Sequence, residues 1–152
     1  METKELLRRI RIFQGLTDEE LDKFASITTV ENFPPKAIII EEGAEGKALF
    51  IVKRGTVSVF KIDGELKTEL LKLVVGEHFG EMSLIEDAKT SACVTAYNEV
   101  SCLVIGREPF LSLLESDVNI AARVYKNFTR ALSERLRLTS SELQTWKPEI
   151  EL

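Results

Sequence analysis

The spacing of hydrophobic positions changes twice along the chain and divides it into three stretches. From Lys4 to about Thr29, apolar residues recur at the three- and four-residue spacing of helices. Thr17 and Glu20 have the spacing of a capping box, which predicts that a helix begins at Thr17. We therefore expect two short helices within residues 1–32.

The middle stretch, residues 33–106, consists of short β-like runs separated by turn signals such as Pro34-Pro35, Gly55 and Asp63-Gly64. Several short strands with regular turns are typical of an antiparallel sandwich, roll or barrel. The predicted strands are AIII (37–40), ALFIV (48–52), TVSVFKI (56–62), ELLKLV (69–74), ACVTAY (92–97) and VSCLVI (100–105).

The helical spacing returns at Arg107 and continues to about residue 145. A helix over residues 119–141 would be about 33 Å long, more than one side of a small β-roll requires. Its wide apolar stripe fits two arrangements: packing wholly on its own domain, or pairing with the same helix of a second copy. We favour the second, a homodimer.

Composition limits the function. The 152 residues suit one domain, and the formal charge of −5 argues against a surface built to hold nucleic acid. One histidine, His78, and two cysteines are a poor inventory for a metal hydrolase or a histidine-based nucleophile. We therefore expect a protein that is not an enzyme, holds no metal or cofactor, and has no nucleic-acid partner.

The N-terminal residues are charged and lack a signal-peptide pattern, and no apolar run reaches membrane-spanning length. A cytoplasmic protein without a membrane partner is expected, with Cys93 and Cys102 reduced. Both cysteines are interpreted as core residues. A hairpin turning at Asn98-Glu99 would make them diagonal neighbours, too far apart for an easy disulfide.

The segment from Gly76 to Val94 carries the candidate chemistry. Gly76 and Gly80 permit unusual backbone geometry on either side of Phe79. Residues 81–84 are predicted to form one helical turn between two strands, with outward amides that suit an anion and the Glu81 carboxylate as an acceptor for a sugar hydroxyl. The alternative is a tight loop with no ligand.

The run FGEMSLIEDAKTSACV resembles the phosphate-binding cassette of cyclic nucleotide-binding domains. The segments IIEEGAEGKALFIVKRGTVSVF (39–60) and CLVIGREPFLSLL (102–114) are similar to the strands and helix that flank the cassette in that family. The resemblance implies a single α+β domain over residues 1–152. It would be an antiparallel β-roll or jelly roll (33–106, cassette 79–92) between N-terminal helices (1–32) and a long C-terminal helix (107–145).

The resemblance also implies site roles. Glu81 matches the family's acceptor for the ribose 2′-hydroxyl, and the amides of Gly80, Met82 and Ser83 match those that face the cyclic phosphate. Ser91 and Ala92 match the pair that completes the phosphate and base contacts. The candidate ligand-binding residues are Phe79, Gly80, Glu81, Met82, Ser83, Lys89, Thr90, Ser91 and Ala92. The ligand implied is cAMP or cGMP.

The chain departs from the family at the arginine that pairs with the phosphate, where Thr90 stands, with Lys89 in the preceding proline slot. Losing a hydrogen bond to a charged group, about 1.5–3 kcal/mol, weakens binding by about ten- to a hundredfold. Lys89 would replace the arginine only as a point charge. Three outcomes stay open: a bound cyclic nucleotide, another small anion, or a ligand-free pocket.

Two functions are consistent with these residues. The first is a regulatory sensor that binds its ligand in the roll and transmits the change through the C-terminal helix. The second is a ligand-free dimerisation or adaptor domain that keeps the fold. His78 is interpreted as a loop residue, and Arg135, Thr139 and Ser140 as residues that would cap the base. The DNA-binding module of the catabolite-activator-like branch is expected to be absent.

Overall fold

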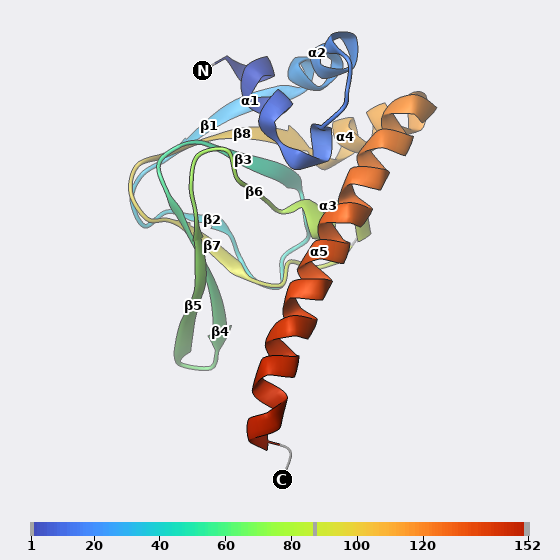
Figure 1. The fold of residues 1–152 in the computed structure, drawn as a ribbon. Coiled ribbons are helices and arrows are strands. Elements are labelled where there is room, and N and C mark those ends of the chain that lie inside the picture. The colour runs from blue at the N-terminus through green and yellow to red at the C-terminus, as the bar shows by residue number, and fades with distance from the viewer. Residues whose placement is uncertain (1, 87, 151–152) are drawn as a thin grey trace.

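A computed structural model describes residues 2–86 and 88–150 and shows a β-roll with helices over one end and one side (Figure 1). The helical elements are α1 (Thr3–Arg9), η1 (Arg11–Phe13), α2 (Asp18–Ser26), α3 (Glu81–Glu86), α4 (Arg107–Ser116) and α5 (Val118–Ile150). The strands are β1 (Thr28–Phe33), β2 (Ile38–Ile40), β3 (Ala48–Arg54), β4 (Val57–Asp63), β5 (Leu66–Leu73), β6 (His78–Phe79), β7 (Cys93–Ala96) and β8 (Val100–Gly106).

The strands form two four-stranded sheets in which every pairing is antiparallel. The order is β1-β8-β3-β6 in the first sheet and β2-β7-β4-β5 in the second. The β4–β5 hairpin turns at Gly64-Glu65, one residue beyond the predicted Asp63-Gly64, and projects beyond the rest of the roll (Figure 1). The predicted fold class, an antiparallel roll with flanking helices, is confirmed.

Two predictions about the strands are wrong. Residues 28–32, assigned to the N-terminal helices, belong to β1, which pairs along its whole length with β8. The predicted β7–β8 hairpin does not form, because β7 and β8 lie in different sheets. Cys93 and Cys102 are therefore not cross-strand neighbours, although both are buried and free, as their interpretation as core residues requires.

The N-terminal helices cover the first sheet. The Thr17 side chain accepts a hydrogen bond from the Glu20 amide while the Glu20 carboxylate accepts from the Thr17 amide, so the predicted capping box is confirmed. The Phe24 ring lies 4.6 Å from that of Phe13 and 5.9 Å from that of Phe110, measured between centroids. These aromatic contacts join α2 to η1 and α4.

Helix α5 is longer than predicted, with 33 residues. Asp117 stabilises its start by accepting hydrogen bonds from the amides of Asn119 and Ile120. Further along, the buried Asn127 side chain donates to the carbonyls of Ile12 and Gln14, at 3.0 and 2.9 Å, and so fastens the helix to η1.

Buried hydrophobic residues form two clusters, which we name by location. The helix-covered cluster lies under the helices and comprises Leu6, Leu7, Ile10, Ile12, Phe13, Leu16, Leu21, Phe24, Leu49, Ile51, Leu84, Leu103, Ile105, Phe110, Leu114, Ile120, Val124 and Phe128. The roll-interior cluster lies between the two sheets and comprises Ala48, Phe50, Val52, Val57, Phe79, Val94, Ala96, Val100, Cys102 and Val104.

Candidate functional site

The cassette helix α3 is held in place by a glycine turn. Gly80 has a φ of +87°, and a Cβ at this position would lie 2.6 Å from the Ala48 carbonyl oxygen. The left-handed conformation and the close approach to β3 both require glycine. Helix α3 begins at the next residue, Glu81, as one short helix between β6 and β7, which confirms the predicted helical turn.

A cavity of about 450 Å³ lies between α3 and the second sheet. Eight of the nine candidate residues line it, namely Phe79, Gly80, Glu81, Met82, Lys89, Thr90, Ser91 and Ala92. The ninth, Ser83, belongs to α3, but its side chain is outside the described part of the chain. The rest of the wall includes the apolar side chains Ile40, Val59, Leu71, Leu73 and Val94. We call this cavity the roll pocket.

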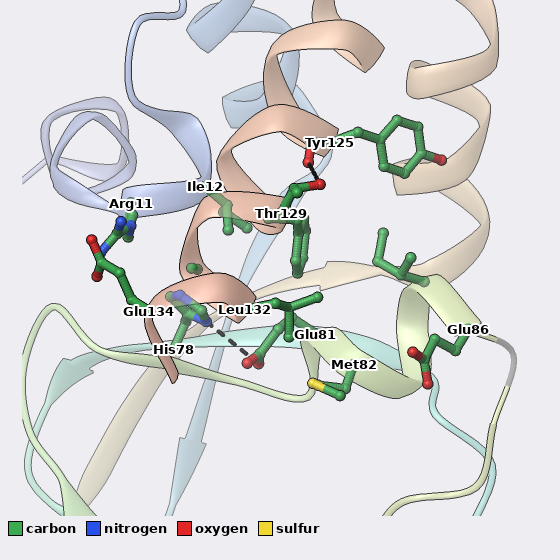
Figure 2. Close-up of a pocket in the computed structure, with 13 residues that line it drawn as sticks. Arg11, Ile12, His78, Glu81, Met82, Glu86, Tyr125, Thr129, Leu132 and Glu134 are labelled. Atoms are coloured by element: carbon green, nitrogen blue, oxygen red, sulfur yellow. Dashed lines mark hydrogen bonds and ion pairs between the residues drawn. The ribbon is translucent and has the colours of Figure 1, made fainter. Parts of the chain in front are cut away.

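The carboxylate of Glu81 is the buried polar group of this pocket, since the residue is only 9% exposed. Nδ1 of His78 lies 3.4 Å from Glu81 Oε2, within ion-pair distance but without the geometry of a hydrogen bond (Figure 2). His78 belongs to strand β6 and lines the roll pocket. Its interpretation as a loop residue is therefore wrong. The three-residue spacing of His78 and Glu81 on either side of Gly80 is the sequence signal from which this pair could have been predicted.

Thr90 is tied to the loop that follows β2. Its hydroxyl donates to the Glu41 carbonyl, and its oxygen accepts from the Ala44 amide at 3.1 Å. Its own amide donates to the Ala44 carbonyl, and its carbonyl accepts from the Gly43 amide. Lys89, next to it, forms an isolated bridge with Glu45 of the same loop. Thr90, which stands where the resembling family has an arginine, thus anchors this loop.

A second cavity, of about 400 Å³, lies on the other side of α3, where η1 and α5 face it (Figure 2). Its walls include Phe128 and Leu132 of α5, and an ion pair between Arg11 and Glu134 stands at its edge. The hydrogen bond from Arg11 holds the pKa of the Glu134 carboxyl below its usual range. Because His78, Glu81 and Met82 line both cavities, α3 separates the roll pocket from the long helix.

Three further features bear on the chemistry of the chain: the cysteines, the acidic and histidine side chains, and the far part of α5. Burial raises the pKa of the Cys102 thiol to about 12, so this cysteine stays protonated. Among the described residues, no group of three or more His, Cys, Asp and Glu side chains is placed to hold a metal ion, and no helix is long and apolar enough to cross a membrane. The base-capping candidates Arg135, Thr139 and Ser140 lie in α5 with side chains outside the description.

Comparison with known proteins identifies one family. The family model described as "Cyclic nucleotide-binding domain" matches residues 30–117. Among curated proteins, cGMP-dependent protein kinase 2 of Mus musculus is 38% identical over 112 residues, which are 72% of this chain and 15% of the kinase. The chain therefore spans about a seventh of the length of that relative.

Solved structures of two proteins show the same fold. The catabolite activator protein of Thermus thermophilus has a TM-score of 0.78 and 32% identity, over 90% of this chain and 63% of that chain. The regulatory subunit of a cAMP-independent protein kinase A from Trypanosoma cruzi, bound to guanosine, has a TM-score of 0.69 and 26% identity. That match covers 88% of this chain and 49% of the other.

Proposed function

Because the chain belongs to the cyclic nucleotide-binding domain family, we propose that it is a regulatory module that binds a cyclic nucleotide or a related nucleoside-type ligand in the roll pocket. Cyclic GMP and cAMP are the cyclic nucleotides proposed, and the mouse kinase is named for its dependence on cGMP. The Trypanosoma cruzi regulatory subunit bound to guanosine supports extending the class to nucleosides. We propose a regulatory role without catalysis.

The observation that carries this proposal is the position of the Glu81 carboxylate in the roll pocket. The Glu81 residue is 9% exposed and shares the pocket with the apolar side chains of Val59, Leu71 and Leu73. A carboxylate accepts hydrogen bonds, which the hydroxyls of a ribose can donate, while a flat base suits apolar walls. A pocket of about 450 Å³ is large enough for a ligand of this size.

Calorimetric titration of the purified protein with cAMP, cGMP, adenosine and guanosine tests the proposal. We expect saturable binding of one ligand per chain. Glu81→Ala should weaken that binding by about ten- to a hundredfold, since a hydrogen bond to a charged group contributes about 1.5–3 kcal/mol. Glu86→Ala is the matched control, because Glu86 is an exposed carboxylate on the same short helix and the same pocket wall.

Two results would contradict the proposal. One is an unchanged affinity in Glu81→Ala, which would remove this carboxylate from the site. The other is no heat and no rise in melting temperature with any of the four ligands at millimolar concentration. That second result would favour the alternative function, a ligand-free dimerisation or adaptor domain. Melting curves of both variants without ligand show whether each still folds.

We propose further that the ligand acts on α5 through α3. The support is that α3 forms one wall of the roll pocket and, on its other side, one wall of the cavity that α5 also lines. A ligand that binds one arrangement of these helices more tightly shifts the population towards it. Trp146, the single tryptophan of the sequence, belongs to α5, so ligand-dependent tryptophan fluorescence tests the transmission. No change at saturating ligand would contradict it.

A homodimer through α5 is also proposed. The exposed apolar residues Val118, Tyr125 and Leu132 recur every seven positions along this helix, the spacing of a coiled-coil seam. Sedimentation is expected to show a species of about 34 kDa, twice the 17.1 kDa of the chain. Leu132→Glu should return it to the monomer, whereas Ser133→Glu, on the neighbouring exposed position, should not. A 17.1 kDa species of the unmodified protein at high concentration would contradict the dimer.

The remaining proposals, on nucleic-acid binding and on location, are based on the formal charge and on the cysteine thiols. The formal charge of −5 disfavours a nucleic-acid partner, which requires a basic surface. Cys93 and Cys102 are free, which fits a reducing compartment, and we propose the cytoplasm and no membrane partner. Retention on a heparin column at low salt would contradict the first of these proposals.

A further inference from the structure

Thr90 has no donor left for a phosphate. A threonine offers one hydroxyl proton and one amide proton. The hydroxyl proton goes to the Glu41 carbonyl and the amide proton to the Ala44 carbonyl, at 2.8 Å for the amide. Both bonds anchor the loop after β2, so releasing either donor would leave a loop carbonyl without its partner.

The lysines near the roll pocket are a poor substitute for an arginine. The Lys61 ammonium donates to the Ser91 carbonyl and lies 3.5 Å from the Glu42 carboxylate, which offsets its charge. Lys89 lines the pocket but is exposed, and an exposed ammonium gains little from an ion pair. It also lacks the planar fork that holds a phosphate at two oxygens.

Acidic groups outnumber basic ones around this pocket. Glu81 and Glu86 line it, against Lys89 as the one lysine or arginine among the described lining residues. The loop bonded to Thr90 contains two further acidic residues, Glu41 and Glu45, while the charge of its third, Glu42, is offset by Lys61. His78 is the remaining titratable lining residue, and it faces the Glu81 carboxylate. A ligand phosphate would therefore enter a region of like charge, which costs free energy.

We infer that the roll pocket prefers an uncharged purine nucleoside to the corresponding cyclic nucleotide. The inference rests on the proposed function, since it assumes a nucleoside-type ligand in this pocket. A nucleoside keeps both features that the pocket offers: ribose hydroxyls for the Glu81 carboxylate and a base for the apolar walls. It loses only a phosphate for which Thr90 has no donor.

The test compares dissociation constants of guanosine with cGMP, and of adenosine with cAMP, in one buffer. We expect at least one nucleoside to bind about tenfold more tightly than its cyclic nucleotide, a difference of about 1.4 kcal/mol. Equal or tighter binding of both cyclic nucleotides would overturn the inference and leave the proposed function standing. No binding by any of the four ligands would overturn both.

Salt supplies a second readout that needs no variant. Repulsion between the pocket carboxylates and a phosphate is screened by salt. Cyclic-nucleotide affinity should therefore rise from low to high ionic strength while nucleoside affinity stays unchanged. A cyclic-nucleotide affinity that falls with salt would show net attraction and overturn the inference.

Thr90→Arg tests the role of this position directly. An arginine here adds a phosphate-binding fork, so we expect cyclic-nucleotide affinity to rise at least tenfold and nucleoside affinity to change less than threefold. Thr90→Val is the control, because it also removes the hydroxyl that anchors the loop but adds no charge. If Thr90→Arg fails to fold, as melting curves would show, Lys89→Glu replaces it. That variant should weaken only the cyclic nucleotides, and equal weakening of both ligand classes would overturn the inference.

Discussion

The two hydrophobic clusters are built from the same strands but are closed in different ways. The helix-covered cluster takes Leu49, Ile51 and Leu103 from β3 and β8 and is sealed by helices at the N-terminus and by α4 and α5. The roll-interior cluster takes the alternate residues of those strands, such as Phe50 and Val104, and leads to the roll pocket. Alternation along a strand thus supplies a sealed core on one face and a ligand-sized opening on the other.

Because of this difference, we expect the helix-covered cluster to determine stability and the side chains of the roll pocket to determine ligand affinity. Side chains under the helices are fully buried, and their removal leaves a cavity that the fold cannot fill. Side chains at the pocket, such as the half-exposed Leu71, already face open space. Substitutions in the first region should lower the free energy of unfolding, and substitutions in the second should change ligand affinity first.

The largest effect is expected at Phe24, whose ring contacts Phe13 and Phe110 in the helix-covered cluster. Phe24→Ala should lower the free energy of unfolding by about 3–5 kcal/mol, measured by urea denaturation. Leu71→Ala, at the roll pocket, should lower it by less than about 1 kcal/mol and is the matched control. Equal losses of unfolding free energy in the two variants would contradict the proposed difference between the two regions.

Asn127 is expected to give the next largest effect. Asn127→Ala leaves the carbonyls of Ile12 and Gln14 without their donor, which should cost about 1–3 kcal/mol in the same denaturation experiment. Ser133→Ala, at an exposed position of α5, is the control and should cost almost nothing. A neutral Asn127→Ala would mean that η1 is not fastened to α5 by this side chain.

The capping box of α2 should contribute less. Thr17→Ala removes the acceptor for the Glu20 amide and should lower stability by about 1 kcal/mol without changing ligand affinity. Glu19→Gln, in the same first turn but outside the box, serves as the reference. A loss of ligand affinity in Thr17→Ala would show that the sealed region and the pocket are coupled more tightly than the structure indicates.

The smallest effect is expected from Asp117. Hydrogen bonds from the Ile120 amide and from Lys23 hold the pKa of this carboxyl below its ordinary value of 3.8. A lowered folded-state pKa stabilises the protein above the ordinary value, and this contribution is lost as the pH falls through the lowered one. Melting temperatures of Asp117→Asn should therefore lie below those of the unmodified protein at pH 7 and converge with them below about pH 3.8. A gap that persists at the lowest pH would exclude this charge as the cause.

Much of the fold could be predicted because its signals are local. The two residues of the capping box, the glycines around the cassette and the successive apolar positions of the long helix are each separated by only a few residues of sequence. Strand β1 was missed because Val30 is exposed and most of its neighbours are polar, so the strand lacks an alternating pattern. The β7–β8 hairpin was predicted wrongly because a three-residue connection is short enough for a hairpin, whereas here the chain crosses between sheets.

The sequence predicts that the candidate residues lie together but not the charges around them, and their role in ligand binding stays a prediction. Eight candidate residues share one pocket because the cassette is a continuous segment. The engagement of Thr90 with Glu41 and Ala44, 49 and 46 residues away, depends on the packing of a distant loop. The pairing of Lys61 with Glu42 likewise depends on how β4 lies beside that loop. No spacing within the sequence encodes these contacts.

Amide hydrogen exchange with and without saturating guanosine tests the central claim, that the roll pocket is the ligand site and the helix-covered cluster is the sealed core. Exchange in peptides from residues 78–92 should slow when the ligand is added, while exchange in residues 18–26 of α2 stays unchanged. The same experiment with cGMP covers the case in which the cyclic nucleotide binds more tightly. Unchanged exchange over residues 78–92 at saturation, or slowing confined to α2, would contradict the claim.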